Sequence, residues 1–393
     1  MTKSVFVATT EPYSGKSIVA LGLVNMLLGK TKKIGYFKPV INIEQGEEKD
    51  AHIQTITEYF NLGIKYEDTY AFTRSGLMRQ MENSNQDSIL HTIIHKFKKL
   101  EEDYDFTVIE GSDFLGEGTA FEFELNLSIA KNLNTPVIFV SSGENKTTAE
   151  IVSAVMNAFR NFQSREVQVI AIVVNKVKPA QAEDVHQLLT YQLTERIILA
   201  VIPLNKALLS PSMKEIHEAL NGNLLFGEEH LSNQVDNVVI GAMNVPHFLN
   251  HIKENVLIIT PGDRGDMIIA ALQANLSISY PKVSGIVLSA GFEPEEPIMR
   301  LLQGLQSVIP IILVTSGTFE TSTKIGAIKS RITPDNTKKI QLAISIFERH
   351  VDVQALDQKM VTFKPEGITP HMFQYQLTKW AKKKIKHIVL PEG

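Results

Sequence analysis

Three consecutive residues near the N-terminus, Gly15-Lys16-Ser17, are suited to holding phosphate groups. Backbone N–H groups in such a loop, and at the start of the helix after it, converge on one anion. Gly15 lets the backbone approach a phosphate closely, Lys16 can reach the outer phosphates of a nucleotide, and the Ser17 hydroxyl can ligate Mg²⁺. The chemistry expected here is the binding of ATP, or of a related phosphorylated ligand, together with Mg²⁺.

The residues around this motif have the order that a phosphate-binding loop requires. The apolar run 5–8 predicts a short buried strand, and residues 18–28 predict a helix. Thr10 stands where the first glycine of such a motif is usually found, and Ser14 directly precedes the Gly-Lys-Ser triplet. The alternative is a loop that keeps its shape but has lost its ligand.

Polar residues also stand at the ends of later predicted strands. Lys38-Pro39 is expected to stop the second strand at its C-terminal end, where ligands of open parallel sheets are found. Glu110 ends another strand and is placed to hold Mg²⁺, directly or through water. Asn175 follows the most hydrophobic strand, and its amide could read the edge of a base. Plainer alternatives exist for two of these residues, Lys38 as a solvated lysine and Asn175 as a turn residue. Asp50, which stands ahead of a predicted helix, has the alternative of a helix cap.

The elements that must position these residues form an α/β pattern. Several apolar segments show no polar alternation and are separated by helical segments, which indicates a parallel sheet covered by helices on both faces. These segments are 33–40, 107–111, 136–143, 169–177 and 199–203.

Composition limits the class of protein. The 393 residues, 44% of them hydrophobic, suffice for two or three domains. The net charge of -4 provides no basic field for nucleic acid or an anionic membrane. The absence of cysteine excludes disulfides and thiolate chemistry. No signal peptide is recognisable, and no apolar run approaches the ~20 residues that cross a bilayer. We therefore expect a cytoplasmic protein that binds neither nucleic acid nor membranes.

Four short segments form a spaced set that points to a family: Thr10-x4-Gly15-Lys16-Ser17, Lys38-Pro39-Val40, Val108-Ile109-Glu110-Gly111 and Val174-Asn175-Lys176. The set resembles dethiobiotin synthetase, which also has threonine in place of the first glycine and binds ATP with Mg²⁺. The resemblance implies a metal site at Ser17, Glu110 and Asp50, since Asp50 matches the metal-linked aspartate of that family. Together with the loop chemistry, it implies nucleotide binding by Thr10, Ser14, Gly15, Lys16, Ser17, Lys38 and Asn175.

One segment departs from that family. Ser112-Asp113-Phe114 replaces the glycine-rich stretch on the substrate side, so the resemblance does not extend to the binding of diaminopelargonate. A ParA-type ATPase would have a second lysine early in the loop, where this chain has Thr10 and Glu11.

A second, smaller α/β domain is predicted after Lys206. Apolar strand-like runs recur at 238–243, 256–260, 285–289 and 311–315. The stretch Val238 to Ala270 resembles the DRTGG domain: Asp263-Arg264 remain, and Gly265-Asp266 stand where Thr-Gly would be. The resemblance implies a ligand-sensing or subunit-contact module. The alternative is a structural turn in which Arg264 pairs with a nearby carboxylate.

The C-terminal residues carry a third resemblance. Ile388-Val389-Leu390-Pro391-Glu392-Gly393 resembles the first strand of the catalytic domain of phosphate acetyltransferase. A lone buried strand would leave its backbone groups without partners, so we expect the chain to stop at the start of a further domain. The predicted division is 1–206 for the phosphate-loop domain, 207–353 for the DRTGG domain, and 354–393 for a linker with that strand.

The order of these parts resembles the long, multidomain bacterial phosphate acetyltransferases. That family interconverts acetyl-CoA plus phosphate with acetyl phosphate plus CoA in its C-terminal domain. The resemblance implies that this chain has no catalytic residues for acetyl transfer and regulates activity and assembly through a nucleotide or metabolite effector. Its expected partners are the acetyltransferase domain of the same polypeptide and further copies of itself. The alternatives are a stand-alone ATP-dependent ligase resembling dethiobiotin synthetase, and an oligomerisation region with a vestigial loop.

Overall fold

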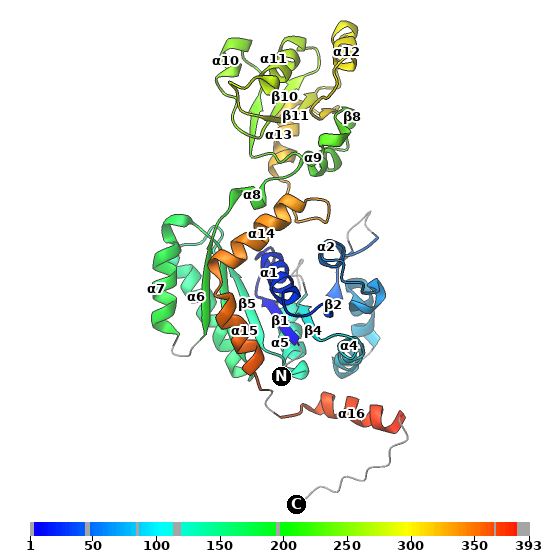
Figure 1. Cartoon of the computed structure of the whole chain (residues 1–393), viewed down its shortest axis with the longest axis vertical. Coiled ribbons are helices and arrows are strands. Elements are labelled where there is room, and N and C mark those ends of the chain that lie inside the picture. The colour runs from blue at the N-terminus through cyan, green and yellow to red at the C-terminus, as the bar shows by residue number, and fades with distance from the viewer. Residues whose placement is uncertain are drawn as a thin grey trace, which may run out of the picture. The chain divides into compact units, whose positions relative to one another are not determined.

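The computed structural model describes residues 4–43, 48–83, 86–112, 119–193, 197–364 and 367–382. The chain forms two compact units: Met1–Leu204 with Thr337–Gly393, and Asn205–Asn336 (Figure 1). Asp113, Phe114 and the strand predicted at 388–393 lie outside the described residues. Within the described ranges, no helix has the length and apolar character needed to cross a membrane.

Seven described strands of the first unit form one sheet in the order β3-β2-β4-β1-β5-β6-β7. Every neighbouring pair is parallel, and β1, β2 and β5 are buried along their whole length. This arrangement confirms the predicted parallel α/β sheet with helices on both faces, because strands covered on both sides have no polar face. The strands are β1 (Ser4–Thr9), β2 (Ile34–Ile41), β3 (Tyr70–Thr73), β4 (Phe106–Glu110), β5 (Val137–Ser142), β6 (Val169–Val177) and β7 (Ile198–Pro203).

Helices cover both faces of this sheet. One apolar core joins the strands to four helices on the same face: α4 (Gln86–Glu101), α5 (Thr119–Leu133), α6 (Thr148–Ser164) and α7 (Ala182–Gln192). The other face carries α1 (Lys16–Leu28), α14 (Thr337–His350) and α15 (Val353–Thr362). The remaining helices of the unit are α2 (Ala51–Tyr59), α3 (Arg74–Asn83) and α16 (Pro370–Lys382), of which α16 packs on α4 and α5.

Helix α1 is buried on two sides because α14 lies directly on it (Figure 1). A Cβ atom added at Gly22 would lie 2.1 Å from Cγ of Phe347, so the glycine provides the notch that accepts this ring. Asn25 Nδ2 donates a hydrogen bond to Glu348 Oε1 at 2.9 Å, on the same pair of helices. Helix α14 therefore belongs to the first unit, although residues 337–353 were predicted to lie in the second domain and 354 onward in a linker.

Strand β2 is longer than predicted. It continues through Lys38-Pro39 to Ile41, whereas we expected the proline to end it. The backbone N–H of Lys38 donates to Thr69 O on the β3 side, and pairing with β4 ends at Phe37. The missing N–H of Pro39 would point to the β4 side, so its absence costs no hydrogen bond of the sheet.

The second unit has its own sheet of five described strands in the order β8-β12-β11-β10-β9, with β8 antiparallel to β12. Phe248, Met267 and Leu302 pack on one face, and Met213, Ile216 and Ile325 on the other. This confirms the smaller α/β domain. Its elements are α8 (Lys206–Leu209), α9 (Met213–Leu220), β8 (Asn223–Phe226), β9 (Asn237–Ile240), α10 (Val245–Leu249), β10 (Val256–Pro261), α11 (Gly265–Leu276), β11 (Val283–Ser289), α12 (Glu296–Gln303), β12 (Ile311–Leu313) and α13 (Thr318–Gly326).

Candidate functional site

The loop between β1 and α1 has the backbone of an anion cradle. Gly15 has φ +84°, and a Cβ atom added there would lie 2.1 Å from Asn175 Nδ2, so this position requires glycine on both counts. In the described part of the chain, no side chain caps α1, and its first turn contains no acidic residue. The N–H of Ile18 in this first turn bonds to the Gly15 carbonyl at 3.1 Å, and the helix dipole favours an anion at this end of α1.

Residues at the ends of β1 and β6 hold this loop in shape. Thr9 Oγ1 donates to Ser14 Oγ at 2.7 Å, and Asn175 Nδ2 donates to the Ser14 carbonyl at 2.9 Å. A register irregularity in β6 accompanies Asn175, and the next residue, Lys176, has φ +58°. Asn175 is 97% buried in this position, since only 3% of it is exposed. Asn175 thus stabilises the loop through its bond to the Ser14 carbonyl. Its predicted contact with a base stays a prediction.

Glu11, which sequence reasoning did not assign to the site, anchors the outer part of the loop. Its carboxylate accepts hydrogen bonds from the Ser142 backbone N–H at 2.8 Å and the Ser141 hydroxyl at 3.3 Å. Lys146 Nζ lies 2.6 Å from the other carboxylate oxygen. Thr10 and Glu11 also line an open cavity of about 410 Å³ between the loop, α5 and α6.

Glu110 is the centre of the polar cluster beside the loop. Lys16 Nζ donates to the Gly111 carbonyl at 2.6 Å and lies 3.5 Å from Glu110 Oε1. The Tyr36 hydroxyl donates to Glu110 Oε2 at 2.5 Å. His52 Nδ1 lies 2.9 Å from Glu110 Oε1 and 3.3 Å from Ser17 Oγ. The structure thus brings together three predicted residues, from the start of α1 and the end of β4, with two that were not predicted.

The charge of Glu110 is set by these neighbours. Burial alone would raise its pKa, but the nearby charges of His52 and Lys16 lower the pKa to about 2. Glu110 is therefore a carboxylate at neutral pH, although none of its surface is exposed. A buried carboxylate next to a phosphate-binding loop is suited to a divalent cation.

Lys38 and Asp50 form a second buried pair, with 2.9 Å between Nζ and Oδ2. Asp50 also caps α2, because its Oδ1 accepts from the backbone N–H groups of His52 and Ile53. Its Oδ2 further accepts from Asn42 N at 3.3 Å. The helix-cap interpretation of Asp50 is confirmed, and its role as a metal ligand stays a prediction.

Tyr36 and His52 were not predicted to belong to the site, and only Tyr36 could have been recognised from the sequence. Tyr36 stands two positions before Lys38 on β2, so the two side chains share a face of the sheet, and this alternation could have pointed to it. His52 follows Asp50 in the first turn of α2, and nothing in its local sequence indicates a contact with Glu110.

The predicted turn of the second unit is held internally. Arg264 forms a bidentate pair with Asp266, both N···O distances being 2.8 Å. Arg264 Nη2 also donates to the Met243 carbonyl at 3.2 Å. This confirms the structural alternative, in which Arg264 pairs with a nearby carboxylate.

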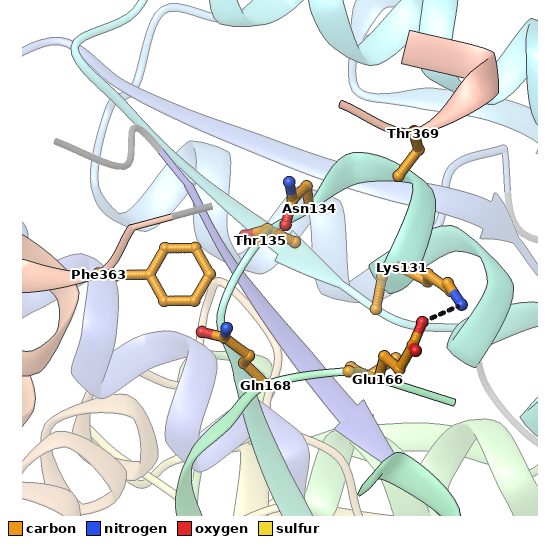
Figure 2. A pocket seen from close by; sticks show the side chains of 9 residues that line it. Lys131, Asn134, Thr135, Glu166, Gln168, Phe363 and Thr369 are labelled. Carbon is orange, nitrogen blue, oxygen red and sulfur yellow. Dashed lines mark hydrogen bonds and ion pairs between the residues drawn. The ribbon is translucent and has the colours of Figure 1, made fainter. Parts of the chain in front are cut away.

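Figure 2 shows a small cavity of about 70 Å³ away from the phosphate-binding loop. Thr135 and Gln168, which line it, precede β5 and β6, so it lies at the amino-terminal edge of the sheet. Lys131 and Glu166 form an ion pair of 3.0 Å on its rim (Figure 2). Its position separates it from the nucleotide-binding residues predicted here.

Comparisons with known proteins agree with this architecture. Residues 3–212 match a family model described as AAA domain, and residues 215–328 match the DRTGG domain. A phosphate acetyltransferase of Nitratidesulfovibrio vulgaris is 36% identical over 398 residues, which cover 100% of this chain and 56% of that protein. A phosphate acetyltransferase of Synechocystis sp. is 36% identical over 395 residues, which cover 100% of this chain and 57% of that protein. The chain thus spans just over half the length of these curated relatives.

Solved structures resemble single parts of the chain. The CBS and DRTGG domains of the regulatory region of Clostridium perfringens pyrophosphatase, complexed with the activator diadenosine tetraphosphate, are 22% identical, with a TM-score of 0.25. That match covers 36% of this chain and 64% of the other. The cobyrinic acid a,c-diamide synthase of Mycobacterium smegmatis with bound ADP and magnesium is 14% identical, with a TM-score of 0.32, covering 52% and 88%.

Proposed function

Because the chain belongs to the family described as the AAA domain and carries a DRTGG domain as well, we propose that it is the regulatory and assembly region of a phosphate acetyltransferase. Its relatives of that name align along the whole chain. We assign the interconversion of acetyl-CoA plus phosphate with acetyl phosphate plus CoA to the part of such a protein that this chain does not span. We further propose that the chain is cytoplasmic and assembles into a homo-oligomer.

The effector that we propose is ATP with Mg²⁺. The observation that carries this proposal is the uncapped start of α1, with Gly15 left-handed and Lys16 and Ser17 following it. Backbone amides there would hold the β- and γ-phosphates. Lys16 would exchange its bond to the Gly111 carbonyl for phosphate oxygens, which form stronger charge-assisted bonds.

The residues beside the loop fit a divalent cation that arrives with the nucleotide. Ser17 Oγ and Glu110 Oε1 lie 3.3 Å and 2.9 Å from the same atom, His52 Nδ1, so the hydroxyl and the carboxylate belong to one polar cluster beside the loop. Across the described residues, no group of three or more His, Asp or Glu side chains makes a complete metal site. Phosphate oxygens and water would therefore complete the shell, as is usual for Mg²⁺, and the cation would neutralise phosphate charge.

Calorimetric titration with Mg-ATP tests this proposal. Wild-type chain should bind, and Lys16→Ala should weaken binding by roughly 1.5–3 kcal/mol, about 10- to 150-fold, because charge-assisted bonds to phosphate are lost. Lys131→Ala is the matched control: Lys131 pairs with Glu166 at the other edge of the sheet, so its removal should leave binding unchanged. Absence of binding to the wild type would remove the nucleotide role and leave the oligomerisation region with a vestigial loop.

A second assay separates regulation from the ligase alternative. Phosphate release from ATP that requires diaminopelargonate and bicarbonate would indicate a ligase resembling dethiobiotin synthetase. We expect no such release, because Ser112-Asp113-Phe114 replaces the substrate stretch of that family. The intact gene product can also be assayed for acetyl transfer with and without ATP. ATP should change the activity of the wild type, and it should not change the activity of the Lys16→Ala variant.

A further inference from the structure

His52 Nδ1 lies next to both groups to which the proposed function assigns the cation. Its Nδ1 lies 3.3 Å from Ser17 Oγ and 2.9 Å from Glu110 Oε1. These side chains come from three different elements: His52 from the first turn of α2, Ser17 from α1 and Glu110 from β4. Ser17 and Glu110 were predicted to hold a cation, and His52 was not.

The separations match those of ligands that share one ion. Bonds of about 2.1–2.2 Å at right angles place neighbouring ligand atoms about 3 Å apart, and octahedral divalent ions have this geometry. The two distances from His52 Nδ1 lie on either side of that value. His52 Nδ1 therefore lies at a separation from Ser17 Oγ, and from Glu110 Oε1, that two ligands of one cation have.

The predicted metal ligand Asp50 is less free to bind a cation. Its carboxylate oxygens accept from two backbone N–H groups at the start of α2, from Lys38 and from the backbone of Asn42. Binding a cation directly would break contacts that hold the helix start and compensate a buried lysine. The side chain of His52 is 29% exposed, and its backbone N–H donates to the cap residue Asp50, which fixes the start of α2 from which the side chain extends.

Building on the proposed function, we propose that His52 is a protein ligand of the nucleotide-bound cation, and that it makes the site prefer a first-row transition ion such as Mn²⁺ over Mg²⁺. Mg²⁺ prefers an all-oxygen shell, whereas imidazole nitrogen is an ordinary ligand of transition metals. To bind a cation through Nδ1, the imidazole of His52 would be neutral and would carry its hydrogen on Nε2.

Pulsed electron paramagnetic resonance of bound Mn²⁺-ATP tests the ligand directly. The wild type should show ¹⁴N coupling to the bound Mn²⁺, and labelling with ¹⁵N-histidine should replace it with ¹⁵N coupling. This measurement needs no substitution, so it does not depend on whether a variant folds. His52→Gln should lose the coupling, and His186→Gln, which changes an exposed histidine on α7, should keep it.

Calorimetry with each metal tests the preference. The wild type should bind Mn-ATP at least about 10-fold more tightly than Mg-ATP, and His52→Gln should reduce that ratio to about 3 or less; a 10-fold ratio corresponds to about 1.4 kcal/mol. If nucleotide binds but nitrogen coupling is absent and the ratio is the same in both proteins, the role of His52 is refuted and the proposed function stands. If the wild type binds neither complex, both are refuted.

Discussion

Replacement of Glu110 by glutamine removes one buried charge and keeps the shape of the side chain. In the wild type this carboxylate faces Lys16 and His52 and accepts the Tyr36 hydroxyl. The amide oxygen of glutamine can still accept from Tyr36, so that bond survives. What is lost is the buried negative charge that compensates the Lys16 ammonium and faces His52, and such a loss is costly.

The magnitude follows from the pKa. Folding lowers the pKa of Glu110 from its ordinary 4.5 to about 2. A change of one in pKa corresponds to about 1.4 kcal/mol in the free energy of ionisation. The ionised group therefore stabilises the folded chain by about 3 kcal/mol at neutral pH. Because the folded pKa is the lower one, this stabilisation is complete above 4.5 and is lost as the pH falls from 4.5 through about 2.

Urea unfolding at pH 7 and pH 3 measures this effect, with amide hydrogen exchange in β1 and β4 reporting on the first unit. Glu110→Gln should be less stable than the wild type by about 3 kcal/mol at pH 7, and the gap should shrink to about 1 kcal/mol at pH 3. Glu144→Gln is the control, since Glu144 is 40% exposed and pairs with Lys176, so its variant should stay within about 1 kcal/mol of the wild type at both pH values. An equally large gap for Glu110→Gln at the two pH values would refute the charge argument.

Three further substitutions test single contacts. Gly22→Ala should destabilise the first unit by about 1–3 kcal/mol in urea unfolding, because its Cβ would meet the Phe347 ring, and this outweighs the ~1 kcal/mol gain in helix propensity. Asp50→Ala should cost about 3–5 kcal/mol in the same assay, since it breaks the buried pair with Lys38. Asn175→Ala removes a hydrogen bond to the loop and should weaken Mg-ATP binding by about 1 kcal/mol, or 5-fold, in calorimetry.

Each of these variants has a matched control in the same chain. Gly326→Ala adds a methyl group to open space and should be neutral or stabilising. Asp335→Asn breaks an exposed pair and should cost at most about 1 kcal/mol. Asn134→Ala, at the other edge of the sheet, should leave nucleotide affinity unchanged. If a control variant lost as much stability or affinity as its test variant, the named contact would not be the cause of that loss.

Local sequence was enough to predict the phosphate-binding loop and the class of fold. An apolar strand, a loop ending in Gly15-Lys16-Ser17 and a helix follow one another within 25 residues, so no distant contact is needed to recognise them. Strands without polar alternation indicated a sheet covered on both faces, because a strand buried on both sides is apolar along its whole length. Asp50 was recognisable as a helix cap for the same reason.

Domain limits were harder to read, because a helix shows that it is buried but not which surface buries it. The apolar positions of α14 predict a buried face, and only the folded chain shows that this face lies on α1, with Phe347 against Gly22. Likewise, the residues around Glu110 come from β2, α1 and α2, and Tyr36 is 74 positions away from it.

By itself, therefore, the sequence determined what is encoded within one element: the loop that can cradle phosphate, the strands with two buried faces and the cap of α2. The tertiary structure alone decided which side chains meet, including His52 between Ser17 and Glu110 and the low pKa of that carboxylate. The physical reason is that periodicity and capping act over one or two helical turns, whereas electrostatic interactions depend on distances that chain topology sets.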